Sequence, residues 1–468
     1  MLNFLGPFLR INTLDKNNIK NQFFYLSKES LKDIVFYSRC GIYIPAHDLR
    51  SKSFSKIDSN TINLNSPLLC IYKKADAKLK LKEDRLSWNE SKVKKEITVN
   101  SNAFMTLSLL ELADYYSCFK DIDDNKYALR SIHLKLCKEQ LEFYALHFRN
   151  KDGLFVDKKD LTDPMHQEFN FEDKNTKFKF SDQAFMMAAY YKYSSFDRDK
   201  VKDNNKQEHE YEKFSLDILN MFTQYKEEIY KVSFEELNKI CLALNIFYKY
   251  SGSEKCKILL LDFLDLLIEH YNAKPNLIIN AKLDVSCMLF INCTLMYNNT
   301  SILKFKDTSD DLHEKLSKLY DIDKGILLKE SADKEINYTS DELMLYMYSL
   351  ILYSDFNKVE DNSRMLQDIF KHQILDCGLI LSWPDSPSLD NAEHYRNFSL
   401  KSDDLIQDDD FRMPEVPTPE NNELASIFIK DVVYNKRKET FKQSKLSFDS
   451  SKNMFIFFLT IFFRNQIV

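Results

Sequence analysis

Glycine and proline are scarce in this chain, with six Gly and ten Pro among 468 residues. Phosphate-binding loops need several glycines at close spacing, and the sequence contains no such loop and no Gly-x-Ser-x-Gly. The same scarcity disfavours a β-sandwich, whose many turns use these residues, and it favours long helices. The composition therefore excludes the common glycine-looped nucleotide sites and indicates a helical protein.

Paired cysteines and long apolar segments are also lacking. The nine Cys are odd in number, form no Cys-x-x-Cys, and mostly lie inside apolar helical runs, which is typical of reduced core residues in a cytoplasmic protein. Residues 1–9 hold no basic region, so no signal peptide is expected. The apolar run 454–463 is too short to span a bilayer and predicts a buried terminal helix. We expect no membrane partner.

A strong charge of one sign is missing as well. The formal net charge is −6, whereas a surface dedicated to nucleic acid usually has a basic face. Lysines do gather within 73–95, but acidic residues are interleaved with them, which is typical of a solvated hairpin. We therefore expect no nucleic-acid partner.

What the chain does contain is a repeated helix, apolar nearly all round and closed by Tyr before Ser or Asn. The closing residues are Tyr116, Tyr193, Tyr250, Tyr297, Tyr353 and Tyr434. These helices are expected at 102–116, 182–193, 235–250, 282–297, 340–353 and 422–434. Between them, helices with a single apolar stripe are expected at 126–148, 209–230, 254–271, 309–320 and 361–375. Helices apolar on all sides are buried and striped ones cover them, so the alternation predicts a double ring.

The two ends of the chain leave two questions open. Either the helix at 27–39 or the helix at 453–465 supplies the sixth outer helix, and the other is an accessory. The alternation of Ala and Leu with Lys over 77–82 predicts a strand, with 96–99 as its possible partner. We expect residues 1–100 to form a small helix-plus-β appendage and residues 101–468 to form the helical ring.

A turn phrase adds a family resemblance. Asp152-Gly153-Leu154-Phe155 looks like the Asp-Gly-Leu-aromatic turns of six-hairpin glycosidases. Together with the six helix phrases, it makes the chain resemble the (α/α)6 toroids over about 102–468. That architecture is shared by six-hairpin glycosidases, sugar epimerases, lanthionine-synthetase-like cyclases and protein prenyltransferase β-subunits. The resemblance implies an all-α fold, an (α/α)6 toroid, with a site in the funnel at the N-termini of the inner helices. It singles out no one family.

Carboxylates stand where this funnel is expected. We predict catalytic roles for Asp182, Asp341 and Glu423, and binding roles for Asp284 and Glu342. Opposed carboxylates can serve as acid and base in glycoside hydrolysis. The alternative is that each simply caps its own helix, because acids in a first turn bind free N–H groups and favour the helix dipole.

The long loop 376–420 offers further candidates. Trp383-Pro384-Asp385 places an aromatic ring beside a carboxylate, as in many sugar sites, so Asp385 is a fourth catalytic candidate and Trp383 a binding one. His394 could bind and shuttle a proton. The alternative is a solvent-exposed insertion. Long loops on one face of a ring could also receive a protein partner. Acids and His166 within 157–176 match no metal-ligand spacing, so no metal or cofactor is expected.

Three polar residues lie five positions before a closing Tyr: Glu111, Asn245 and Asn292. They either line the floor of the funnel or join helices by buried hydrogen bonds, and we favour the second interpretation.

Two hypotheses for function remain open. The chain is a carbohydrate-active enzyme, glycoside hydrolase or epimerase-like, acting on a saccharide or other small ligand in the funnel; or it is a non-catalytic toroid that binds a ligand or a protein. The enzyme requires two carboxyls roughly 5–10 Å apart in an open site, and the binding protein does not. The count of only two tryptophans, Trp88 and Trp383, speaks against a sugar site. A fold alone decides nothing between them.

Overall fold

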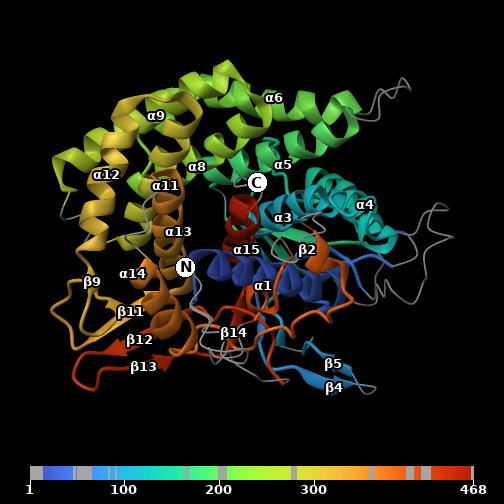
Figure 1. Ribbon diagram of the computed structural model, residues 1–468. Helices are drawn as coiled ribbons and strands as arrows, with labels where there is room; N and C mark the ends of the chain where they lie inside the picture. The colour runs from blue at the N-terminus through green and yellow to red at the C-terminus, as the bar shows by residue number, and fades with distance from the viewer. Residues whose placement is uncertain are drawn as a thin grey trace.

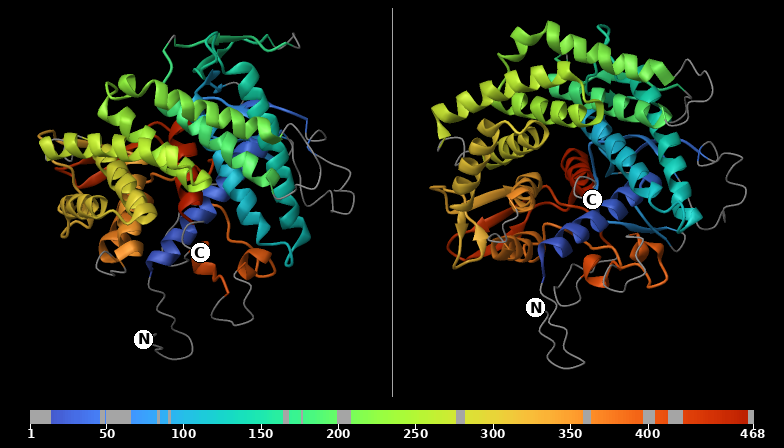
Figure 2. Two further views of the ribbon diagram at one scale, coloured as in Figure 1. Left: turned by 90° about the horizontal axis from the view of Figure 1, so that it is seen from above. Right: turned by 45° about the horizontal axis from the view of Figure 1, so that its top comes forward.

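The chain folds as an (α/α)6 toroid, as predicted (Figures 1 and 2). The computed structural model describes residues 14–45, 49, 66–82, 85–89, 92–163, 168–175, 177–198, 208–275, 282–357, 363–396, 405–412 and 423–464. Within these ranges, six inner helices each pack against the next, and the sixth packs against the first. In ring order they are α3 (Val99–Ser117), α5 (Phe180–Arg198), α8 (Phe234–Ser251), α11 (Leu283–Thr300), α13 (Ser340–Asn357) and α15 (Ser450–Arg464).

Each inner helix is covered by an outer helix. The outer helices, in the same order, are α4 (Asp124–His147), α6 (Glu208–Gln224), α9 (Glu254–Ala273), α12 (Leu303–Ser317), α14 (Ser363–Ile369) with its continuation η3 (Phe370–Leu375), and α1 (Lys16–Tyr37). The short α7 (Lys226–Ile229) extends α6. Nearly every residue of α3 is buried, whereas α4 buries one face. This is the difference in apolar patterning that distinguished the two kinds of helix in the sequence.

The helix predicted at 422–434 is wrong. That segment contains β12 (Asp431–Asn435), the middle strand of a sheet with β11 (Glu335–Thr339) and β13 (Thr440–Gln443). Its burial alternates, with Val432 and Tyr434 buried and their neighbours partly exposed, which is the period of a strand. Tyr434-Asn435 therefore belongs to a strand and does not close a helix.

Both terminal helices belong to the ring, and neither is an accessory. α15 takes the sixth inner place between α13 and α3, and α1 packs against it as the sixth outer helix. The last hairpin of the toroid is thus made from segments near the two ends of the chain, and Figure 2 shows α1 and α15 side by side. A division of the chain at residue 100 stays a prediction.

The remaining strands form small sheets around the ring. The pairs are β1 (Gly41–Tyr43) with β2 (Leu68–Ile71), β3 (Lys74–Asp76) with β14 (Ser447–Asp449), β4 (Lys80–Lys82) with β5 (Arg85–Ser87), β9 (Tyr320–Asp321) with β10 (Ile326–Leu327), and β6 (Glu96–Ile97) with β7 (Lys158–Asp160), which also pairs with β8 (Phe171–Asp173). The predicted pairing of 77–82 with 96–99 is wrong, because β4 pairs with β5 and β6 with β7. β4 ends at Lys82 and β5 begins at Arg85, and strands this close in the sequence pair most easily with each other.

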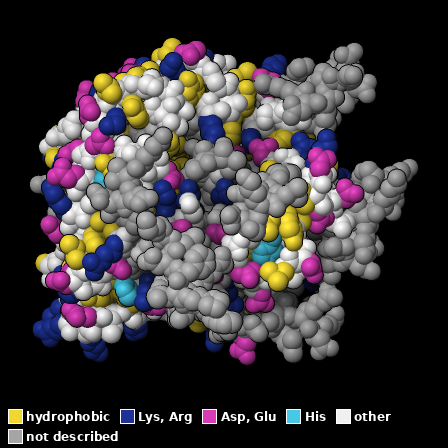
Figure 3. Space-filling model, in the orientation of Figure 1, with side chains coloured by type: hydrophobic (Ala, Val, Ile, Leu, Met, Phe, Trp, Pro, Cys, Tyr) yellow, Lys and Arg dark blue, Asp and Glu magenta, His cyan; other side chains and the backbone are white. Residues whose placement is uncertain are grey.

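None of the helices in the described ranges combines the length and the hydropathy that crossing a bilayer needs. On the face of the molecule in Figure 3, the Lys and Arg side chains of the described residues are intermingled with Asp and Glu side chains.

Candidate functional site

Polar side chains stand directly above aromatic ones at the N-terminal ends of three inner helices. On α5, α15 and α3 the pairs are Asp182 with Phe185, Lys452 with Phe455, and Ser101 with Phe104, each three residues apart and therefore on one helix face. The ring centroid of Phe104 lies 4.5 Å from that of Phe185 and 5.1 Å from that of Phe455. The three rings thus meet across three helices, and the polar groups one turn earlier lie on the same side of their helices. We call this end of the toroid, with Asp182, Lys239, Asp284, Asp341 and Lys452, the ring mouth.

Asp341 is bound on several sides. Lys452 Nζ lies 2.5 Å from both of its carboxylate oxygens. Thr339 Oγ1 donates to Asp341 Oδ1 over 2.6 Å, and the N–H of Glu342 donates over 3.1 Å. Asp341 therefore caps its own helix and also pairs with a cation from the neighbouring inner helix, α15. Its negative charge is compensated by an ammonium group that faces it.

Asp284, in the first turn of α11, lies beside Asp341 in the ring and is partly exposed. Burial raises the pKa of Asp284, and the negative charge of Asp341 raises it further. A hydrogen bond from the N–H of Val285 and the charges of Lys452 and Lys239 act in the opposite direction. The two carboxyls thus interact, and Asp284 keeps its proton to a higher pH than an ordinary aspartic acid does.

Asp182 stands on the opposite side of the ring, because two inner helices separate α5 from α13 in either direction. It is 3% exposed, and Lys179 Nζ lies 4.0 Å from its Oδ2. Burial raises the pKa of Asp182 to about 7. The negative charges of Asp157 and Glu236 raise it as well, whereas the positive charges of Lys179 and Lys239 lower it. The ring mouth therefore holds an acid that titrates near neutral pH.

Two other acids near the mouth serve as caps, the alternative that the sequence left open. Glu342 accepts hydrogen bonds from Lys329 Nζ at 2.8 Å and from the N–H of Thr339 at 3.3 Å. Glu236 of α8 accepts from the N–H and the hydroxyl of Ser181, at 2.9 and 3.0 Å, and so caps the neighbouring α5. Both carboxylates are occupied by the fold. A ligand-binding role for Glu342 stays a prediction.

The candidates from the loop 376–420 contact other parts of the molecule. Trp383 is 4% exposed and its Nε1 donates to Phe411 O over 3.2 Å, so its ring offers little surface for stacking. His394 is buried, with Nδ1 2.7 Å from Ile406 O. The Asp385 side chain is fully exposed, 3.8 Å from Arg412. Glu423 is exposed, and its carbonyl accepts from the N–H of Leu79 over 2.8 Å. These contacts do not connect the four residues with the acids of the ring mouth.

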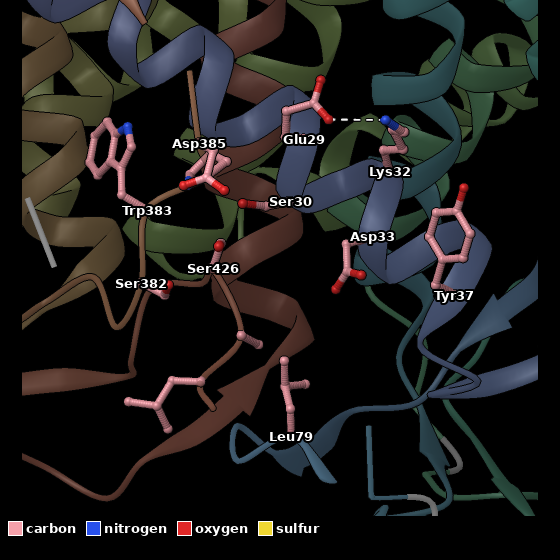
Figure 4. Close-up of a pocket in the computed structure, with 13 residues that line it drawn as sticks. Glu29, Ser30, Lys32, Asp33, Tyr37, Leu79, Ser382, Trp383, Asp385 and Ser426 are labelled. Atoms are coloured by element: carbon pink, nitrogen blue, oxygen red, sulfur yellow. Dashed lines mark hydrogen bonds and ion pairs between the residues drawn. The ribbon is translucent and has the colours of Figure 1, made fainter. Parts of the chain in front are cut away.

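A second place of interest is a pocket of about 440 Å³ beside α1, between α1 and the segments 382–385 and 424–426 (Figure 4). Trp383 and Asp385 belong to it. Although burial alone would raise the pKa of Glu29, Lys28 and Lys32 outweigh it and lower that pKa to about 2. Burial raises the pKa of Asp33, which accepts a hydrogen bond from Trp88. The lining residues are Glu29, Ser30, Lys32, Asp33, Tyr37, Leu79, Ser382, Trp383, Pro384, Asp385, Leu424, Ala425 and Ser426.

Sequence reasoning missed Lys239 and Lys452 at the mouth and the acids of α1. Lys452 could be found only by placing the terminal helix inside the ring, since its role depends on facing Asp341. Glu29 and Asp33 carried a local signal, two acids one helical turn apart. No three His, Cys, Asp or Glu side chains within the described ranges stand close enough together to hold a metal ion. His166 lies outside those ranges.

No family model matches the chain, and no curated protein matches its sequence. Among solved structures it is similar to a D-mannose isomerase, with 9% identity and a TM-score of 0.47 over 95% of this chain and 98% of that one. It is also similar to cellobiose 2-epimerase from Bacillus thermoamylovorans B4167, with 10% identity and a TM-score of 0.49 over 94% of this chain and 99% of that one. A third similar structure is an endoglucanase from the termite Nasutitermes takasagoensis, with 10% identity and a TM-score of 0.41 over 96% of this chain and 98% of that one. At these values the similarities say nothing about activity, and the fold assignment rests on the closed ring of helix contacts.

Proposed function

We propose that this chain is a saccharide-hydrolysing toroid, in which Asp284 donates a proton at the ring mouth and Asp341, paired with Lys452, is the partner carboxyl group. The observation that carries the proposal is the interaction of these two carboxyls on neighbouring helices. Asp341 faces a lysine, while Asp284 is partly desolvated and faces a negative charge. A carboxyl whose pKa is raised by burial and by a neighbouring carboxyl is suited to act as the acid of an acid–base pair.

The surroundings of the pair support a saccharide as substrate. A sugar ring has an apolar face of C–H groups and a rim of hydroxyls. The rings of Phe104, Phe185 and Phe455 meet one helical turn below the polar groups, so the base of the ring mouth is apolar. Asp182, Lys239 and Lys452 provide acceptors and donors for hydroxyls around it. The family resemblance in the sequence suggests the same class of substrate.

Among the carbohydrate reactions, hydrolysis fits the pair best. It needs a carboxylic acid of the protein to protonate the leaving oxygen, a carboxylate of the protein facing the reacting sugar, and a water molecule that replaces the leaving group. Asp182, across the ring from Asp341, supplies a further carboxyl, and burial raises its pKa to about 7. An epimerase-like reaction would use the same acid and base without a water molecule, and product analysis separates the two.

The test is activity on a panel of nitrophenyl glycosides and unlabelled oligosaccharides, with release of nitrophenol or reducing ends as readout. Asp284→Asn and Asp341→Asn should each lower kcat by about a hundredfold or more, as expected for loss of an acid or base. Glu235→Gln is the matched control, because its partner Lys282 and Glu235 itself are exposed, at 53% and 44%. Activity that survives in Asp284→Asn would refute the assignment. Inactivity of the unmodified chain on every substrate, with saccharide binding intact, would favour the non-catalytic toroid.

A further inference from the structure

We propose that the pocket over α1 is a second binding site, separate from the ring mouth, for a small molecule that carries a primary ammonium group. The pocket has about 440 Å³, within the usual range for small-molecule sites. Its lining shares no residue with the ring mouth. The proposal does not depend on the reaction proposed for the mouth.

The charges of the lining favour a cation. Three carboxylates, Glu29, Asp33 and Asp385, line the pocket beside one lysine, Lys32. Glu29 is neutralised by Lys28 at 2.8 Å and by Lys32 at 3.1 Å. Asp33 instead receives its hydrogen bond from the neutral indole of Trp88, at 3.0 Å. Within the described residues no cation lies at ion-pair distance from Asp33, so its charge remains available to a ligand.

A buried hydroxyl points into the same space. Ser30 is 2% exposed, and its Oγ has no hydrogen-bond partner among the described residues. Figure 4 shows this hydroxyl pointing away from α1 toward the side on which Asp385 lies. A buried hydroxyl without a partner is unfavourable, and a ligand N–H would satisfy it. This observation is independent of the charges, and it indicates a missing donor or acceptor in the pocket.

The two observations together define the ligand chemistry. An ammonium group has three donors and no acceptor, and it matches a carboxylate and a hydroxyl oxygen that both accept. The hydroxyls of Ser382 and Ser426 can bind further polar groups of the ligand, and Leu79 and Leu424 can cover its carbon atoms. An anion would be repelled by Asp33 and Asp385. Amino sugars and aliphatic diamines both have the required group.

The tryptophans give a direct readout. The chain has only two, and Trp88 donates to Asp33 while Trp383 lines the pocket. Intrinsic fluorescence of the full chain is titrated with glucosamine, with 1,4-diaminobutane and with glucose, and calorimetry checks the affinities. We expect glucosamine or the diamine to bind at least about tenfold more tightly than glucose, since a hydrogen bond to a charged group is worth about 1.5–3 kcal/mol. Whichever of the two binds more tightly shows whether the pocket prefers an amino sugar or an aliphatic diamine. Equal binding of glucose and the amines, or binding of none, overturns the proposal.

Variants locate the site. Asp33→Asn should weaken amine binding about tenfold or more, and Ser30→Ala should weaken it severalfold. Ser27→Ala is the matched control: its hydroxyl is also buried on α1 without a partner among the described residues, but it does not line the pocket. Its affinity should be unchanged. Amine binding that is normal in both Asp33→Asn and Ser30→Ala overturns the proposal. Asp284→Asn should still bind the amine, so failure of the mouth hypothesis and failure of this one are distinguishable.

Discussion

Lys28 Nζ lies 2.7 Å from Glu393 Oε1, and both side chains are only 1% exposed. Glu393 also receives Lys126 from α4, at 3.0 Å, and Arg396 at 3.5 Å. The short helix η4 (Ala392–Tyr395) is thereby attached to α1 and α4. The alternative in which 376–420 is a solvent-exposed insertion is therefore wrong for this part of the loop.

Removing the charge of Glu393 should be strongly destabilising. Glu393→Gln leaves the half-buried Lys126 and the buried Arg396 without this carboxylate and leaves the buried Lys28 with Glu29 alone. Breaking a buried ionic cluster in this way costs about 3–5 kcal/mol. The exposed pair of Glu314 with Lys318 is the control, and Glu314→Gln should change stability by less than about 1 kcal/mol. Urea unfolding followed by circular dichroism measures both. Equal effects of the two substitutions would contradict a buried ionic role.

Asp182 should make the stability of the chain depend on pH. Its pKa is about 7 in the folded state and near 3.8 in an unfolded chain, so the folded state holds the proton more tightly. That contribution is fully present below pH 3.8 and is lost as the pH rises through about 7, with roughly 4 kcal/mol as its upper limit. Asp182→Asn lacks this titration and should gain stability relative to the unmodified chain between pH 5 and pH 8. Asp217→Asn, the same substitution at an exposed position on α6, is the control in the same urea titrations.

The buried asparagines cross-link α8 and α11, which confirms the favoured interpretation of these polar positions. Asn292 Nδ2 donates to Asn238 Oδ1 over 2.7 Å, and Asn245 Nδ2 donates to Asn292 Oδ1 over 3.0 Å. Asn292→Leu should cost about 2–5 kcal/mol, because it leaves groups of both partners unpaired. Asn220→Leu, on the exposed face of α6, serves for comparison in thermal unfolding and should have little effect. A neutral Asn292→Leu would show that the network contributes only specificity.

A thiol reagent should react with one cysteine of the folded protein and leave the other eight unmodified. All nine cysteines are free, and only Cys118 is exposed. Ellman's reagent should titrate one thiol in the folded protein and nine after unfolding. Burial raises the pKa of Cys118, so the reaction should accelerate as the pH increases. Cys118→Ser should abolish the single native reaction, and a second fast thiol in that variant would contradict the burial of the others.

Local periodicity was enough to predict five of the six inner helices and the toroid itself, because these helices are apolar on every side. The prediction failed at 422–434, because Tyr434-Asn435 was interpreted as the end of a helix. The residues belong to β12, in which Val432 and Tyr434 are buried and their neighbours are partly exposed. The sixth hairpin could not be predicted, since the pairing of α1 with α15 joins segments that share no local pattern. At the mouth, first-turn acids were visible, but their partners were not. Lys452 faces Asp341 only through ring closure, and nothing local distinguishes that lysine from any other.

Closure of the ring by α1 and α15 has a consequence for synthesis. α1 ends at Tyr37 and α15 begins at Ser450, so a ribosome adds more than 400 residues between the two halves of the last hairpin. At about 5–20 residues per second this takes on the order of 20–80 s. During that time Phe23, Phe24 and Leu31 of α1, which are buried in the finished toroid, have no inner helix to cover them. The nascent chain therefore carries an apolar N-terminal segment that chaperones can bind until the final helix emerges.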